Sequence, residues 1–431
     1  MDTGKTEILV DMDVLQARNL LQEGQHREAL PLLERALRRD PGNGAILSDF
    51  SATCGTLGEI ELETRVLGEL APKATQNAPL LAHYAQALGD LGQFEQSISA
   101  FQQALAIDPN QHAIRVAYGM ALLRRGDFGR GWQFYDSLDS VHETAQFSGT
   151  VKPPLYTGGN LHQRTIILLS EQGFGDTIMF ARYATMLAKR GARVVIVTYP
   201  DIADLMRTVP GIAQVSRYGE PIPHVHTYAR LLNLPRIFGT TLWNIPQQVP
   251  YLRAMPSRID HWKQQIGADG AARRVGLVWA GNPSHSRDVF RSTHLQDLAP
   301  LAEVSGITFY SLQKGPRQEE AQNTPPGMRL VDLSSQIQDM SDMAAALQAL
   351  DLLICVDTAP AHLAGALGRP VWTLLPFAPD WRWMLSRSDS PWYPSMRLFR
   401  QPALRDWSGV IRNVRDALYE WHGSANVPSP R

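Results

Sequence analysis

Hydrophobic and polar positions follow a helical rhythm in the first third of the chain. Gly24, Gly58, Gly92 and Gly126 are each 34 residues apart, and apolar residues recur at helical spacing on both sides of them. The clearest unit is 78–110, "APLLAHYAQALGDLGQFEQSISAFQQALAIDPN", which ends in a proline and an asparagine. Each unit therefore predicts a helix, a turn at the glycine, a second helix and a proline stop.

This period resembles a tetratricopeptide array. The resemblance is strong for the first and third units, weaker for the second, and in the fourth the pattern breaks off after 113–137. Because a single repeat cannot bury its apolar face alone, we expect a continuous stack with a concave surface that takes a protein partner. The alternative is that the array only stabilises the rest of the chain.

Near residue 145 the rhythm changes to short β-branched runs. The stretch 147–160, "FSGTVKPPLYTGGN", is typical of a connector. The runs that follow lie at 164–170, 193–199, 273–281, 307–313, 328–334, 352–357 and 369–376, with helical patterns at 176–190 and 339–350. Strands that alternate with helices predict parallel sheets covered on both faces. We therefore expect two nucleotide-fold-like domains with a cleft between them.

Composition and charge exclude several classes of protein. The 431 residues are 44% hydrophobic and 19% charged, with 41 basic and 42 acidic side chains, so no broad electrostatic pull on nucleic acid is expected. The two cysteines, Cys54 and Cys355, predict no disulfide framework and fit a reducing cytoplasm. We expect no signal peptide and no transmembrane helix, because no sufficiently long apolar segment exists.

The first candidate site is "LLSEQGFGDTIMFARY", residues 168–183. Gly173 and Gly175 predict a tight turn between a strand and a helix, although the pattern is not a dinucleotide fingerprint. Asp176 is a candidate general base that faces the cleft, and the alternative is that it caps the helix. Glu171 is a weaker candidate on the same loop.

The second candidate site is the polar loop 276–298, "GLVWAGNPSHSRDVFRSTHLQDL". Arg291 and Ser292 stand before a helix, where a guanidinium and helix-start N–H groups suit a phosphate, and Asn282 lies in the same loop. The alternative is a surface arginine and a capping serine. His285 and Asp288 lack a third ligand, so we predict no metal site.

The third candidate site is "LLICVDTAPAHLAGALGRP", residues 352–370. Thr358 and a proline favour a helix start, whose N–H groups near Ala359 suit a diphosphate. Asp357 would then accept hydrogen bonds from sugar hydroxyls, and His362 either reaches a phosphate or is structural. Nearby, Gln313 and Lys314 end another strand, where we expect contacts to a base edge and a phosphate. The aromatic segment 380–401 is expected to pack in the core. The alternative is a role at the edge of the cleft for its interspersed Arg382, Arg387 and Asp389.

Five stretches together resemble the bacterial tetratricopeptide-repeat glycosyltransferases, whose catalytic half is related to ADP-heptose lipopolysaccharide heptosyltransferases. They are "EQGFGDTIMFARY", "VGLVWAGNPSHSRDVFRS", "YSLQKG", "DTAPAHLAGALGRPVW" and "DWRWMLSRSDSPWYPSMRLFRQ". The resemblance implies an all-α tetratricopeptide superhelix over 1–145, followed by an α/β GT-B fold. Its two Rossmann-like domains would be an acceptor-side domain over 146–255 and a nucleotide-sugar domain over 256–431, with the last helix bracing the preceding domain.

The same resemblance implies metal-independent sugar transfer with inversion and no cofactor beyond the nucleotide-sugar co-substrate. Asp176 maps to the proposed base, and Asp357, Thr358, Ala359 and His362 map to the motif that holds sugar and diphosphate. Our main hypothesis is a cytoplasmic glycosyltransferase whose repeats recruit a protein acceptor. The alternatives are a repeat scaffold with a degenerate transferase half, and a heptosyltransferase-like enzyme of lipopolysaccharide or polysaccharide assembly.

Overall fold

A computed structural model describes residues 12–73, 75–135, 147, 152–267, 273–285 and 287–424. The chain divides into two compact units, the first made of 1–121 with 283–290 and the second of 122–282 with 291–431. The first unit thus ends before residue 145, where we expected the repeat domain to end. The reason is that the last repeat helix belongs to the second unit.

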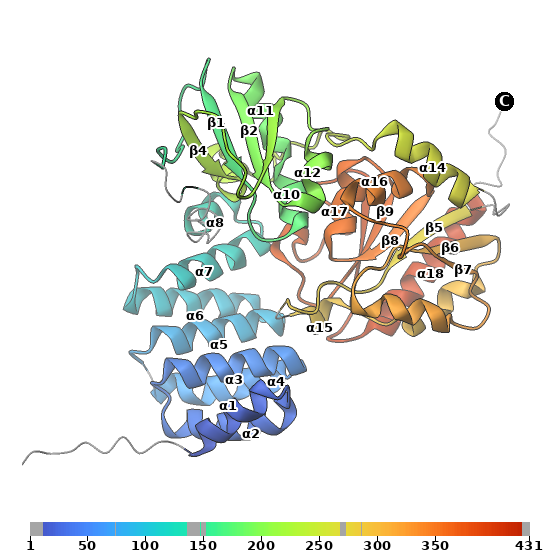
Figure 1. Ribbon diagram of the computed structural model, residues 1–431. Coiled ribbons are helices and arrows are strands. Elements are labelled where there is room, and N and C mark those ends of the chain that lie inside the picture. Colours follow the sequence, from blue (N-terminus) through green and yellow to red (C-terminus); the bar gives the residue numbers. More distant parts are fainter. Residues whose placement is uncertain are drawn as a thin grey trace, which may run out of the picture. The chain divides into compact units, whose positions relative to one another are not determined.

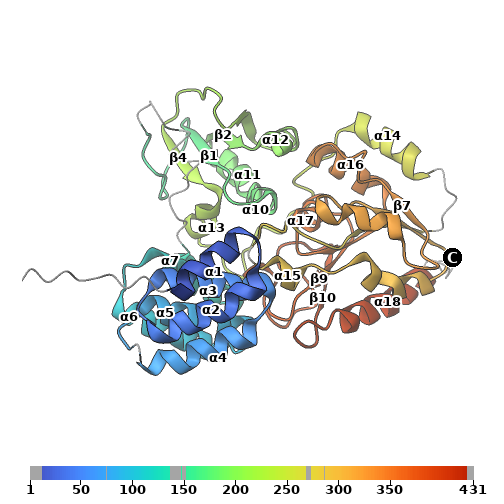
Figure 2. The ribbon, with the colours of Figure 1, turned by 60° about the horizontal axis from the view of Figure 1, so that its bottom comes forward.

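The first unit consists of paired helices. The pairs are α1 (Met12–Gln22) and α2 (His26–Arg39), α3 (Gly44–Leu57) and α4 (Ile60–Leu70), and α5 (Ala78–Asp90) and α6 (Phe94–Ile107). A short helix η1 (Ala71–Lys73) follows α4, and α7 (His112–Arg124) opens a fourth pair that α8 (Phe128–Phe134) completes. Successive helices from α1 to α6 pack side by side (Figures 1 and 2). The predicted array is confirmed, including its weak second unit.

The four spaced glycines make the turn within each pair. Their φ angles are +74° at Gly24, +77° at Gly58, +77° at Gly92 and +91° at Gly126. Residues with a Cβ rarely adopt this left-handed conformation, which explains why glycine recurs at this one position. The 34-residue period of the sequence is therefore the period of these left-handed turns.

Small and charged residues hold the array together. Ala29, Ala36 and Ala104 are fully buried, and their small side chains let neighbouring helices approach closely. Within this unit Arg287, from the segment 283–290, forms an ion pair with Asp90. Burial raises the pKa of the neighbouring Glu63, and the positive charge of Arg287 opposes that rise. The array thus contains a buried cluster of charges in which Arg287 supplies a cation.

A four-stranded parallel sheet opens the second unit (green in Figure 1). Its strands are β1 (Thr165–Leu169), β2 (Arg193–Thr198), β3 (Ile212–Arg217) and β4 (Thr227–Arg230), in the order β3-β2-β1-β4. The helices and short turns are α10 (Phe174–Phe180), α11 (Arg182–Lys189), α12 (Pro200–Met206), η2 (Leu231–Asn233) and α13 (Leu234–Ile237). The predicted helix over 176–190 is two helices, and the sequence did not predict β3 and β4.

A six-stranded parallel sheet follows, in the order β10-β9-β8-β5-β6-β7 (yellow to red in Figure 1). Its strands are β5 (Arg273–Val278), β6 (Ile307–Ser311), β7 (Leu330–Asp332), β8 (Leu352–Val356), β9 (Val371–Leu375) and β10 (Met396–Arg400). Its helices are α14 (Pro256–Gly267), η3 (Leu295–Glu303), η4 (Pro316–Asn323), α16 (Met340–Ala349), α17 (Ala359–Ala366), η5 (Trp381–Trp383) and α18 (Trp407–Ser424), whereas α15 (Asp288–Arg291) lies mostly in the segment 283–290 of the first unit. An all-helical repeat region followed by two parallel sheets is consistent with the GT-B fold.

The last helix differs from its prediction. We expected α18 to cross back and brace the first Rossmann-like domain. Its buried residues Val410, Ile411, Val414 and Leu418 instead join the core cluster of the six-stranded sheet. The apolar stripe of α18 is therefore used to cover the sheet that immediately precedes it in the chain.

Aromatic side chains connect α8 to the rest of the second unit. Trp132 of α8 is 3% exposed, its indole N–H donates to Thr240 O at 2.8 Å, and its ring lies 5.2 Å from that of Trp381. Trp381, Trp383 and Trp392 are each at most 1% exposed. The expectation that this aromatic segment packs in the core is confirmed.

Candidate functional site

Each sheet reverses its strand order beside its first strand. The order turns back between β1 and β4 in one sheet and between β5 and β8 in the other. Ligands of open parallel sheets bind beyond the carboxyl ends of the strands at such points. The three predicted sites follow β1, β5 and β8, and α10 contacts α17. The fold therefore brings the first and third predicted sites together.

Asp176 is engaged through both carboxylate oxygens. It lies in the first turn of α10, where Oδ2 accepts a hydrogen bond from the Gly173 N–H at 3.2 Å. Its Oδ1 accepts a hydrogen bond from Nη2 of Arg382, with which it forms an ion pair. The capping role left open by the sequence is thus seen, and a second, ionic role is added to it.

The two loop glycines act differently from our expectation. The left-handed residue of this turn is Gln172, with φ of +55°, and Gly173 has an extended backbone with φ of −94° and ψ of 172°. Gly175 is needed for space, because a Cβ there would lie 2.9 Å from Cδ2 of His362. The glycine at 175 therefore permits the close approach of the α10 and α17 starts.

Asp357 and Arg291 meet at the start of α17. Nη1 of Arg291 donates to the backbone oxygen of Asp357 at 3.1 Å. Burial and the neighbouring charge of Asp380 raise the pKa of Asp357 to about 6, and Arg291 partly offsets this rise. A carboxylate that is already destabilised is a poor neighbour for a diphosphate, so a hydrogen bond from a sugar hydroxyl is its more favourable use.

Thr358 occupies the N-cap position of α17 as predicted, but its side chain makes no capping hydrogen bond. The Ala361 N–H donates to the Thr358 backbone oxygen at 3.0 Å. Ala359 is the first helical residue and a proline follows it, as the sequence indicates. The helix start is therefore formed by backbone geometry, without help from the threonine hydroxyl.

His362 is a buried neutral histidine. It is 5% exposed, and its Nδ1 lies 3.0 Å from the hydroxyl of Tyr393. Burial, with nearby arginines, lowers the pKa of His362 to about 3. It therefore supplies no positive charge near neutral pH, and its ring orients the hydroxyl of Tyr393.

Two further predicted residues, Ser292 and Gln313, shape the loop after β5. Ser292 Oγ accepts the Gly281 N–H at 2.9 Å. The side chain of Gln313 accepts the N–H groups of Trp279 and Ala280, both at 2.9 Å. These two side chains are thus committed to the loop that follows β5.

Lys314 is likewise engaged with backbone. Its ammonium donates to Ser334 O at 2.8 Å and Ile337 O at 3.0 Å. Two of the three donors of the ammonium are therefore engaged with backbone. Asn282 is exposed in the loop between β5 and α15.

The sequence assigned no specific role to Arg382, although this residue contacts two carboxylates in the candidate site. Arg382 pairs with Asp176 and also donates from Nη1 to Asp380 Oδ1 at 2.8 Å. The only sequence signal was an alternation of tryptophan, arginine and aspartate after residue 379.

Arg182 was not singled out by the sequence. It is 3% exposed and donates to backbone oxygens of Met179, Pro246 and Trp392 and to the hydroxyl of Tyr251. Such a residue is recognisable only once the segments that it joins are known to be adjacent.

Among the described residues, no three His, Cys, Asp or Glu side chains form a group that could hold a metal ion. Cys54 and Cys355 are free and buried. Burial raises the pKa of both thiols. Within the described ranges we also find no helix of the length and apolarity needed to cross a bilayer.

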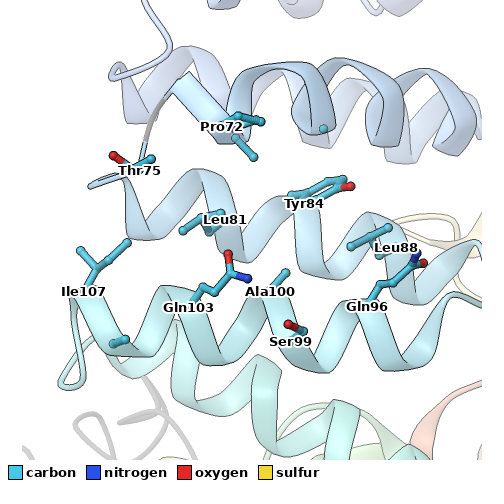
Figure 3. A pocket seen from close by; sticks show the side chains of 13 residues that line it. Pro72, Thr75, Leu81, Tyr84, Leu88, Gln96, Ser99, Ala100, Gln103 and Ile107 are labelled. Carbon is cyan, nitrogen blue, oxygen red and sulfur yellow. The ribbon is translucent and has the colours of Figure 1, made fainter.

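The first unit has a cavity of about 600 Å³, lined by the end of α4, by η1 and by α5 and α6 (Figure 3). Tyr84 and Leu88 supply apolar surface, and Gln96, Ser99 and Gln103 supply neutral donors and acceptors from α6. The described residues of the lining include no Asp, Glu, Lys, Arg or His side chain, so the lining offers no charge that would attract an ionic ligand. This surface therefore suits an uncharged partner segment.

Comparison with known proteins gives two family matches. Residues 252–390 match glycosyltransferase family 9 (heptosyltransferase), and residues 14–48 and 85–140 match the tetratricopeptide repeat. Protein FlbA of Caulobacter vibrioides is 26% identical over 449 residues, which cover 96% of this chain and 74% of that protein. The chain thus combines regions that match the tetratricopeptide repeat with a region, 252–390, that matches glycosyltransferase family 9 (heptosyltransferase).

Two solved structures are similar to part of this chain. The ADP-heptose lipopolysaccharide heptosyltransferase II of E. coli is 14% identical, with a TM-score of 0.46, and the match covers 61% of this chain and 100% of that one. A family 9 glycosyltransferase from Veillonella parvula is 11% identical, with a TM-score of 0.47, and the match covers 62% and 100%. The family matches favour the heptosyltransferase-like alternative over our main hypothesis of a protein acceptor.

Proposed function

We propose that this chain transfers a sugar from a nucleotide-sugar to a saccharide hydroxyl, with inversion and without a metal, as a heptosyltransferase-like enzyme. The observation that carries the proposal is the meeting of α10 and α17, which places Asp176 and Asp357 at neighbouring switch points beside Arg291. The two buried free thiols suit a reducing cytoplasm, where nucleotide-sugars are made.

The chemistry follows from charge. Asp176 takes the proton of the acceptor hydroxyl as that oxygen attacks the anomeric carbon. The bond between the anomeric carbon and the diphosphate breaks, and negative charge grows on the diphosphate. Arg291 and the N–H groups at the start of α17 stabilise that charge, while Asp357 holds a sugar hydroxyl. His362 orients neighbouring groups as a neutral ring.

Calorimetry with UDP, ADP, GDP and CMP, followed by transfer assays with the matching sugar donors, tests the proposal. We expect Arg291→Ala to weaken binding of the preferred nucleotide about tenfold or more, because a charge-assisted contact contributes about 1.5–3 kcal/mol. Asp176→Asn should abolish transfer. Arg412→Ala, an exposed position on α18, is the control and should behave like wild type. Absence of binding to every nucleotide would favour the scaffold alternative.

A second candidate function is transfer to a protein hydroxyl, which the neutral cavity of the repeat unit favours. Such an acceptor would dock an uncharged segment between α4 and α6. Gln103→Arg, at an exposed position of the cavity lining, should then abolish transfer to that protein, while transfer to a soluble saccharide acceptor stays unchanged. Equal loss for both acceptors, or for neither, would count against a protein acceptor that is recruited through the cavity.

A further inference from the structure

Arg382 is the cation that both sides of the candidate site share. Its side chain is 10% exposed, and that of Asp176 is 16% exposed, so their ion pair is largely shielded from water. The guanidinium carbon lies 4.3 Å from the centre of the Trp381 ring, and Nη1 is 2.8 Å from Asp380 Oδ1. One face of the cation is thus covered by an aromatic ring, and its edges point at two carboxylates.

The ion pair with Arg382 conflicts with the proposed role of Asp176 as a general base. Each oxygen of the Asp176 carboxylate already accepts one hydrogen bond, Oδ2 from the Gly173 N–H and Oδ1 from the buried guanidinium of Arg382. To accept a proton on Oδ1 without competition from the guanidinium, Asp176 must first loosen its contact with Arg382. Something must therefore compete for the arginine.

The competing group would have to be an anion close to the α17 start. Arg382 lies in η5, and the ring of the next residue, Trp383, is 5.1 Å from the ring of His362 on α17. Arg291 donates to the backbone oxygen of Asp357 at the start of the same helix. Both arginines therefore belong to segments that meet at α17, beside the proposed position of the donor diphosphate. A diphosphate is multiply charged and accepts hydrogen bonds from guanidinium groups in a fork geometry.

We propose that Arg382 is a donor-operated latch on the base: it pairs with Asp176 when the site is empty and turns to the diphosphate of the donor when the donor binds. Donor binding thereby releases the Asp176 carboxylate for the acceptor hydroxyl. Asp380 keeps the arginine from leaving the site in either arrangement. This proposal rests on the proposed function, because it needs a diphosphate beside α17.

Competition for one cation has a measurable consequence. If the diphosphate must displace Asp176 from Arg382, the Asp176→Asn variant should bind inorganic pyrophosphate and the preferred nucleoside diphosphate about tenfold more tightly than wild type. Tenfold corresponds to about 1.4 kcal/mol, which is about the contribution of one charge-assisted hydrogen bond. In the Asp176→Asn/Arg382→Gln double variant this gain should vanish relative to Arg382→Gln alone. Calorimetry on the full-length chain supplies all four affinities.

A matched control separates the latch from simple charge removal. Asp201→Asn removes an exposed carboxylate from the first turn of α12, beside the same sheet, so pyrophosphate affinity should stay unchanged. If Arg382→Gln fails to fold, Arg382→Lys keeps the charge without the fork and serves as the second background. With that variant the gain from Asp176→Asn should fall to less than half.

The outcomes are distinct. An equal gain from Asp176→Asn with and without Arg382 means that the carboxylate only repels the ligand, and it overturns the latch. Nucleotide binding with no gain in Asp176→Asn also overturns the latch, but leaves the proposed function standing. No binding of pyrophosphate or any nucleotide by any variant overturns both.

Discussion

Replacing Asp357 by asparagine should stabilise the second unit at neutral pH and have little effect at pH 4. Burial and the charge of Asp380 raise the pKa of this carboxyl from 3.8 to about 6. Since each pKa unit corresponds to about 1.4 kcal/mol, ionised Asp357 costs the folded state up to about 3 kcal/mol. Asp357 is half-buried, and solvent reduces this cost, so we expect about 1–3 kcal/mol.

The sign follows from proton binding. Between about pH 4 and pH 6 the folded state binds a proton at Asp357 that the unfolded state has released, so stability falls as the pH rises through this window. Asparagine resembles the protonated acid and has no such dependence. At pH 7.5 the melting temperature of Asp357→Asn should exceed that of wild type by a few degrees, and at pH 4 the gap should close.

Differential scanning fluorimetry or calorimetry at pH 4.0, 5.0, 6.0 and 7.5 measures this gap. Asp260→Asn is the control, because Asp260 is an exposed carboxylate on α14. A gap that is the same at all four pH values, or that grows as the pH falls, would refute the argument that burial and Asp380 destabilise the ionised form.

Two other predictions concern packing. Trp132→Ala should destabilise the second unit by about 3–5 kcal/mol, because a 3% exposed indole that packs on Trp381 leaves a cavity, whereas Trp243→Ala, at a 96% exposed position, should leave the melting temperature unchanged. Gly365→Ala should prevent folding or lower the melting temperature sharply, since its Cβ would lie 2.5 Å from the ring of Tyr393; Gly423→Ala, with no atom within 4 Å, should be tolerated. Equal melting temperatures within either pair would contradict the packing described here.

The sequence predicted the parts of the fold whose signals are local. The left-handed glycines occur once per repeat, and buried central strands such as β1, β2 and β8 have continuous apolar runs. β3, β4 and β10 were missed for a physical reason. β3 and β10 are edge strands with polar residues among the apolar ones, and β4 has only four residues, so their patterns are indistinct.

The candidate site could be predicted only as separate pieces. Asp176, Arg291 and Asp357 were singled out because each lies where a strand gives way to a helix. The ion pair between Asp176 and Arg382 joins residues 206 positions apart, and no local pattern indicates it. The sequence also does not tell whether Gln313 and Lys314 bind a ligand or bind backbone groups, as they do in the structure.

The position of α8 has a consequence for how such chains can change over evolutionary time. A recombination that exchanges the repeat array cannot use the connector after residue 145, because it would remove Trp132 from the core that contains Trp381. A junction near residue 121 avoids that loss, but the segment 283–290 stays behind with Arg287, whose partner Asp90 belongs to the array. We therefore expect arrays and transferase halves of related chains to be inherited together, and a hybrid of two relatives to require a compatible acid opposite residue 287.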